Sequence, residues 1–156
     1  MEERLVKTPE DVLVVLNQIK AQAPVEGDLL SALATALKST REKILKGITL
    51  LDWNAWFLRT GFISYGLLQN LNFDESGFVK LLLDKHRMYG VGPLLNWKQL
   101  GIVMRLDSKV ARILNIVAHN VEVAAGDESL LDNLKDCLGY CILGYLLCQR
   151  GVIESD

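Results

Sequence analysis

The chain has 156 residues, of which half are hydrophobic and only three are proline. This length and composition are typical of one compact globular domain spanning residues 1–156, and they exclude a disordered chain. The formal net charge is −2 and no long run of lysine or arginine is present, so nonspecific nucleic-acid binding is not expected.

Apolar residues recur with helical spacing from the start of the chain. A helix is predicted from Pro9 to about Ala23, because Thr8 can cap it, proline suits its first turn and two acids follow. A second helix is predicted to start at Asp28. The basic segment 38–46 either continues this helix or forms a short one of its own.

The segment Trp53–Leu71 is predicted to be a central core helix with Asp52 as its cap. It is long enough to span a bilayer, but six polar residues interrupt it, so no membrane association is expected. These residues are Asn54, Arg59, Thr60, Ser64, Gln69 and Asn70. The next helix is predicted to open at Asp74 and to end at the turn Tyr89-Gly90-Val91-Gly92-Pro93.

Two short helices are predicted around Asn96–Met104 and Asp107–Asn120, and a last one follows Asp127. No segment alternates polar and apolar residues with period two, and no repeat of 20–50 residues is present. The predicted fold class is therefore all-α, a compact bundle of six to eight helices.

The last helix carries the most informative pattern. Glu128, Asp132 and Asp136 share one helix face, opposite an apolar stripe. Beyond them the same face is apolar, so the second half of this helix is expected to be buried. The acids stand where the exposed face becomes enclosed, where a metal or cationic ligand could be held. The alternative is that they complement the helix N-terminus and are otherwise solvated.

A basic face precedes this helix. Arg105, Lys109 and Arg112 recur at helical spacing, and they either face solvent or bind phosphate, for which Arg112 offers two parallel hydrogen bonds. The glycines after Tyr89 either form a plain turn or admit a ligand close to the backbone. They are not a dinucleotide fingerprint, because no strand precedes them and the third glycine is missing.

The cysteine and histidine residues give little indication of a reactive thiol, a zinc site or a catalytic triad. Cys137, Cys141 and Cys148 lie in an apolar context, where they are expected to act as small core residues. The absence of a secretion signal and the free thiols favour a cytoplasmic location. His86 and His119 are isolated, so neither a zinc site nor a catalytic triad is indicated.

Four polar motifs follow one another in the second half of the chain, and these are Lys85-His-Arg-Met-Tyr89-Gly90, Asn96-Trp97, Arg105-Leu-Asp107-Ser-Lys109-Val-Ala-Arg112 and Asp127-Glu128-Ser-Leu-Leu-Asp132-Asn-Leu-Lys-Asp136-Cys-Leu-Gly-Tyr140. Taken in this order, they resemble a small all-α family common in phages. That family is described as a nucleotide-modification-associated domain of the first type, and it is similar in turn to MazG-like nucleoside triphosphate pyrophosphatases. The resemblance covers residues 78–148. It implies a family-like core over residues 78–150, on which the unassigned helices of residues 1–77 would pack.

The resemblance implies a nucleotide pocket with or without magnesium. Phosphates and base would be bound by cations and an aromatic ring, namely Lys85, Arg87, Tyr89, Lys109 and Arg112. A Mg²⁺ ion would be held by Asp107, Glu128, Asp132 and Asp136. MazG-like enzymes also carry an earlier ExxE pair, which is absent here. Its absence weakens the case for hydrolysis more than the case for binding.

Three functions follow as hypotheses. The first is binding or sequestration of a (deoxy)nucleotide in phage-type nucleotide metabolism, in the host cytoplasm if the chain is phage-encoded. The second is an Mg²⁺-dependent nucleotide pyrophosphohydrolase, and the third is a helical protein–protein adaptor without a small ligand. A homo-oligomer is also expected, because the segments 53–71 and 137–148 are apolar around most of their circumference.

Overall fold

The computed structural model describes residues 4–47, 52–119 and 128–151. Over these ranges the chain forms seven α-helices and no β-strand, which confirms the predicted all-α bundle of six to eight helices. The helices are α1 (Pro9–Lys20), α2 (Leu29–Leu45), α3 (Trp53–Gln69), α4 (Glu75–Tyr89), α5 (Gly92–Leu95), α6 (Lys98–His119) and α7 (Leu130–Gln149).

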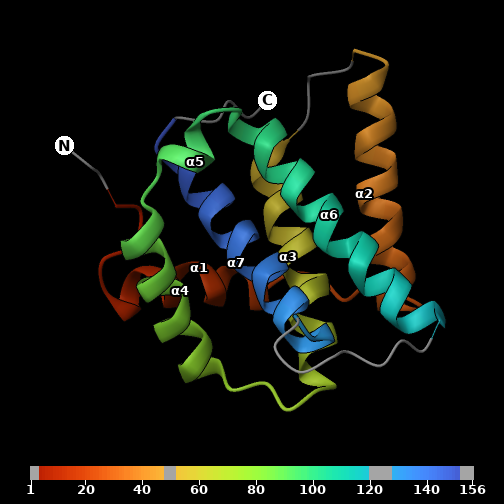
Figure 1. The fold of residues 1–156 in the computed structure, drawn as a ribbon, viewed down its shortest axis with the longest axis horizontal. Helices are drawn as coiled ribbons and strands as arrows, with labels where there is room; N and C mark the ends of the chain where they lie inside the picture. The colour runs from red at the N-terminus through yellow and green to blue at the C-terminus, as the bar shows by residue number, and fades with distance from the viewer. Residues whose placement is uncertain (1–3, 48–51, 120–127, 152–156) are drawn as a thin grey trace.

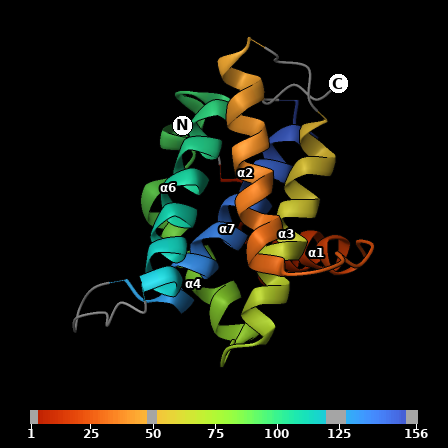
Figure 2. The same ribbon diagram turned by 90° about the vertical axis from the view of Figure 1, so that its right-hand side faces the viewer.

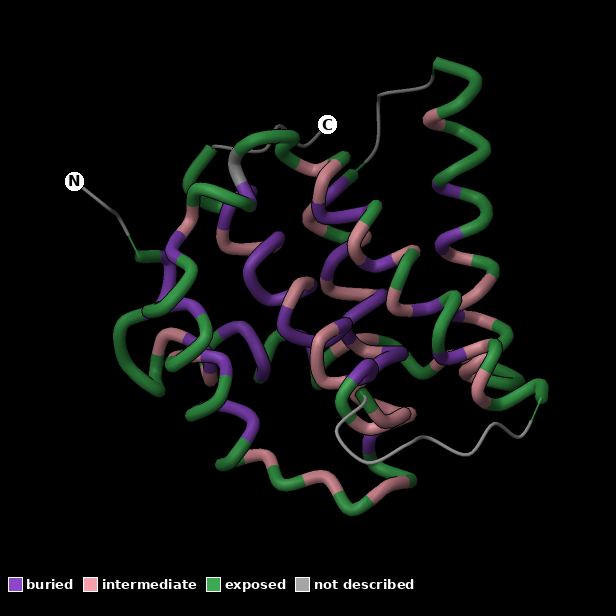
Figure 3. The backbone as a smooth tube through the Cα atoms, in the orientation of Figure 1, coloured by how far each residue is buried: buried purple, intermediate pink, exposed green. Residues whose placement is uncertain are grey.

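Helices α3 and α7 lie side by side at the centre of the bundle (Figure 1, Figure 2), and theirs is the most extensive contact between any two described helices. Helix α6 also packs on α7, α2 contacts α3 and α6, and the crosswise α1 contacts α3, α4 and α7. Buried positions concentrate on α3 and α7 (Figure 3). The prediction that segments 53–71 and 137–148 form the most buried pair of helices is confirmed.

Two of the predicted helix starts, at Asp28 and Asp52, are capped by local hydrogen bonds. The Asp28 carboxylate accepts from the Leu30 amide at 2.9 Å, and the Asp52 carboxylate accepts from the Ala55 amide at 3.1 Å. Each bond satisfies one of the amides that the first helical turn leaves without a partner. At the C-terminal end of α4, Gly90 adopts a φ of +66°, a backbone conformation that residues with a side chain rarely adopt.

The predicted division of α6 into two short helices is wrong. One continuous helix runs from Lys98 to His119, and the predicted end at Asn120 lies outside the described residues. Ile102, Leu106, Val110 and Ile113 recur at helical spacing and are all buried, so one apolar face runs through the predicted break. The basic segment 38–46 continues α2 as far as Leu45.

The second half of α7 is enclosed, as its apolar circumference predicts. Residues 141–144 are all buried, and so are Cys137, Cys141 and Cys148, which confirms their place in the core. Burial raises the pKa of the Cys137 thiol to about 12. Among the described helices, none is long and apolar enough to cross a bilayer. The expected homo-oligomer stays a prediction.

Candidate functional site

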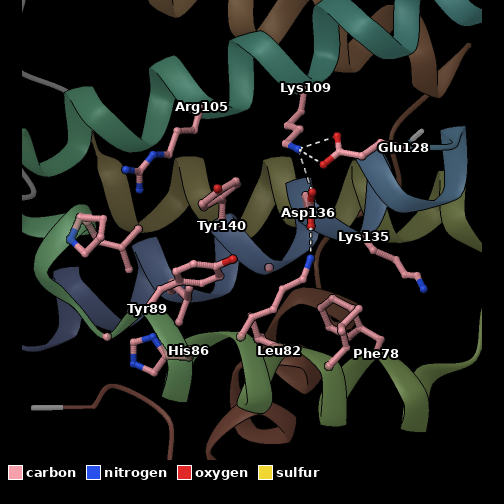
Figure 4. Close-up of a pocket in the computed structure, with 17 residues that line it drawn as sticks. Phe78, Leu82, His86, Tyr89, Arg105, Lys109, Glu128, Lys135, Asp136 and Tyr140 are labelled. Atoms are coloured by element: carbon pink, nitrogen blue, oxygen red, sulfur yellow. Dashed lines mark hydrogen bonds and ion pairs between the residues drawn. The ribbon is translucent and has the colours of Figure 1, made fainter. Parts of the chain in front are cut away.

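A pocket of about 390 Å³ opens between α4, α5, α6 and α7 (Figure 4). Its apolar wall is formed by Phe78, Leu82 and Leu143. Gly139 lets the backbone of α7 approach this wall closely, since a Cβ atom there would lie 3.2 Å from the Leu82 side chain. The pocket is of the size typical of small-molecule sites.

The structure brings five of the predicted site residues together around this pocket. Lys85 and Tyr89 come from α4, Lys109 from α6, Asp136 from α7, and Glu128 lies just before α7. These residues are up to 51 positions apart in sequence, as in the pair of Lys85 and Asp136. They are neighbours because α6 packs on α7, and because the side chains of Lys85 and Leu82 on α4 reach the same stretch of α7.

One end of the pocket is a chain of alternating charges. Lys85 contacts Asp136 at 3.1 Å, and Asp136 contacts Lys109 at 2.9 Å. Lys109 also donates to both oxygens of Glu128, at 2.9 and 3.1 Å, and Arg112 donates to Glu128 at 2.8 Å. Burial of Lys109 opposes its charge, but the hydrogen bonds to Glu128 and Asp136 outweigh this effect and raise its pKa above the usual value.

The other end of the pocket is aromatic. Figure 4 shows the rings of Tyr89 and Tyr140 between Arg105 on one side and Asp136 on the other. The Arg105 guanidinium lies 6.0 Å from the centre of the Tyr140 ring, a distance at which cation and ring attract. Within the described part of the chain, no carboxylate is within ion-pair distance of Arg105. Both the charge and the flat surface of the Arg105 guanidinium are thus available to a ligand.

Three other predicted residues lie outside the pocket. Asp107 forms an ion pair with Arg41 of α2 at 3.0 Å, so it joins α6 to α2 instead. Arg87 is exposed and lies 3.8 Å from Asp84, one helical turn earlier. Arg112 does not line the pocket either, but it reaches the site through Glu128.

Asp132 has a structural role at the start of α7. Its carboxylate accepts from the Ser129 amide at 3.1 Å and from the Ser129 hydroxyl at 2.9 Å, while the Asp132 amide donates to that hydroxyl at 3.1 Å. This is a reciprocal capping box. The hydrogen bond from the Ser129 amide is the main reason that the pKa of Asp132 lies below its usual value.

The four carboxylates predicted to bind Mg²⁺ are not gathered. Asp107, Asp132 and the Glu128–Asp136 pair take part in three separate interactions, and no group of three or more metal-binding side chains is placed to share an ion in the described ranges. The four carboxylates therefore do not meet around one point, and the predicted Mg²⁺ site stays a prediction.

Sequence reasoning did not select three further pocket residues, Lys135, Tyr140 and His86, and it considered Arg105 only as part of a basic helix face. Tyr140 follows Asp136 by one helical turn, so the shared helix face was a signal that could have found it. His86 is buried, and its Nε2 accepts a hydrogen bond from the Leu5 amide at 2.8 Å. No sequence signal indicated that the segment before α1 reaches the wall of this pocket.

No family model, curated protein or solved structure matches this chain. What the pocket binds must therefore be inferred from its own side chains.

Proposed function

We propose that this pocket binds a nucleotide, and that the protein binds or sequesters the nucleotide without hydrolysing it. The observation that carries the proposal is the difference between the two ends of the pocket. Tyr89, Tyr140 and the Arg105 guanidinium offer flat surfaces on which a base can stack. At the opposite end, Lys85 and Lys109 offer positive charge to a phosphate.

The charge of the pocket supports an anionic ligand. Four cationic side chains line it against two carboxylates, and these are Lys85, Arg105, Lys109 and Lys135 against Glu128 and Asp136. Since the whole chain is slightly acidic, this local excess of cations departs from the average surface. A phosphorylated ligand would gain binding free energy from this excess, because the cations can form charge-assisted hydrogen bonds to its phosphate.

The contacts that the carboxylates make favour binding of a nucleotide over its hydrolysis. A metal-dependent pyrophosphohydrolase needs acids that face one another around Mg²⁺. Here Asp136 and Glu128 hold lysine and arginine side chains, and Asp132 caps a helix. The motif resemblance to a phage nucleotide-modification family supports the same ligand class, with a role in nucleotide metabolism.

The proposal is tested by thermal shift and titration calorimetry with nucleoside mono- and triphosphates, with and without Mg²⁺. A ligand at about 100 times its dissociation constant is expected to stabilise the fold by about 2.7 kcal/mol. Replacing Tyr89 with Ala should weaken binding by roughly 1 kcal/mol if the ring stacks on the base. Met88→Ala is the control, because Met88 is exposed to a similar extent as Tyr89 and does not line the pocket.

Two results would contradict this proposal. Release of pyrophosphate on incubation with Mg²⁺ and a nucleoside triphosphate would establish the hydrolase alternative. A lack of binding to every nucleotide would leave the protein–protein adaptor as the remaining hypothesis.

A further inference from the structure

The carboxylate of Glu128 lies between two cations of α6. Its Oε2 accepts from Lys109 at 2.9 Å and from Arg112 at 2.8 Å, and its Oε1 accepts from Lys109 at 3.1 Å. Lys109 and Arg112 are three residues apart on one helix, so their side chains can reach the same anion. The pair therefore forms a preformed site for a negatively charged group.

The Glu128 side chain is more exposed than that of its neighbour Asp136. Its side chain is 47% exposed, whereas the side chain of Asp136 is 19% exposed and that of Lys109 is 13% exposed. A carboxylate with this exposure can turn into water at little cost in solvation. Asp136 would meanwhile keep its contacts to Lys85 and Lys109, so neither lysine would be left without a partner.

We infer that Glu128 occupies the phosphate subsite of this pocket, and that a ligand's phosphate displaces its carboxylate from Lys109 and Arg112. This inference rests on the proposed function and specifies which end of the ligand binds where. The base would stack near Tyr89 and Tyr140, and the phosphate would lie beside the start of α7.

The exchange favours phosphate for a physical reason. A terminal phosphate carries close to two negative charges near neutral pH and three acceptor oxygens, whereas the carboxylate carries one charge and two oxygens. Lys109 and Arg112 can donate to separate oxygens of the phosphate, so it is bound more strongly than the group it replaces. An uncharged nucleoside cannot make this exchange, so the pocket should select for phosphorylated ligands.

The test compares the wild type with Glu128→Gln, using inorganic pyrophosphate and a nucleoside monophosphate as probes in titration calorimetry. Because the variant removes the competing anion, both probes should bind about tenfold more tightly. Asp84→Asn is the matched control. It removes one negative charge from a side chain on α4 that does not line the pocket, and it should leave both affinities unchanged.

Arg112→Gln, made alone and together with Glu128→Gln, separates displacement from a general change in charge. If phosphate takes the place of Glu128, the loss caused by Arg112→Gln should be larger in the Glu128→Gln background, where no carboxylate engages the arginine. The inference is overturned if Arg112→Gln causes equal losses of affinity in both backgrounds, or if wild type and Glu128→Gln bind the probes equally well. In either case, binding of the nucleotide by the wild type would still uphold the proposed function. A failure of every variant to bind either probe would overturn both.

Discussion

The ring of Phe57 on α3 lies directly over Gly144 on α7. A Cβ atom built at Gly144 would lie only 2.5 Å from Cε1 and 2.6 Å from Cζ of this ring. Phe57 is fully buried, so the ring has no free space into which it could move. The absence of a side chain at Gly144 is therefore what allows the two central helices to pack closely.

Gly144→Ala should destabilise the protein by about 1 to 3 kcal/mol, because the added methyl group overpacks the core between α3 and α7. Urea denaturation would measure the change. Gly92→Ala is the control, since a Cβ atom there meets nothing within 4 Å and the backbone is not in the left-handed region. Equal stability of the two variants would show that α3 and α7 are not closely packed at this point.

Asp132→Ala should reduce the free energy of unfolding by about 1 kcal/mol at neutral pH, since it removes the capping box of α7. The pKa of Asp132 is lowered in the folded protein, so its contribution is present above the unfolded value of about 3.9 and is lost as the pH falls through the folded value. Thermal unfolding at pH 7 and at pH 3 would show the difference shrink. If acids clustered around a metal site instead, this substitution would be neutral or stabilising in the metal-free protein.

Asp136→Asn and Glu128→Gln should differ in their effect on stability. Asp136 is largely enclosed and holds both Lys85 and Lys109, so its neutralisation should cost about 1 kcal/mol or more. Glu128 is half exposed, so its neutralisation should change stability by less than about 0.5 kcal/mol. Urea denaturation of both variants would measure this order, and the reverse order would contradict the assignment of Asp136 as the central anion of the network.

The three thiols should react slowly in the native protein. Burial raises the pKa of Cys137 to about 12 and that of Cys148 to about 11, and it raises the pKa of the fully buried Cys141 as well. Little thiolate is thus present at pH 8, and access to it is restricted. Labelling with a thiol reagent should proceed in denaturant and hardly at all without it. Rapid labelling of a native cysteine would contradict its place in the core.

Much of the secondary structure follows from interactions between residues close in sequence. Asp28 and Asp52 bind amides two and three residues away, and Ser129 and Asp132 complete their capping box within one turn. Such contacts form wherever the local pattern occurs, so helix starts can be predicted from it. The periodic apolar residues of α3 and α7 likewise predict that these two helices occupy the core.

The continuity of α6 was missed although the sequence carries a signal for it. No proline or glycine lies between Met104 and Asp107, and Ile102, Leu106, Val110 and Ile113 recur at helical spacing across this stretch. These four side chains are buried along one face of the continuous helix.

The amino-acid sequence by itself determined that the chain is all-α, where most helices start, and which acids and bases share a helix face. Only the tertiary structure decided which of these groups meet. It placed Asp136 between Lys85 and Lys109, bound Asp107 to Arg41 of α2, and left Arg105 beside Tyr140. Helical periodicity fixes the direction of a side chain around its own axis. Its partner on another helix depends on how the buried faces pack, and that packing joins residues far apart in the chain.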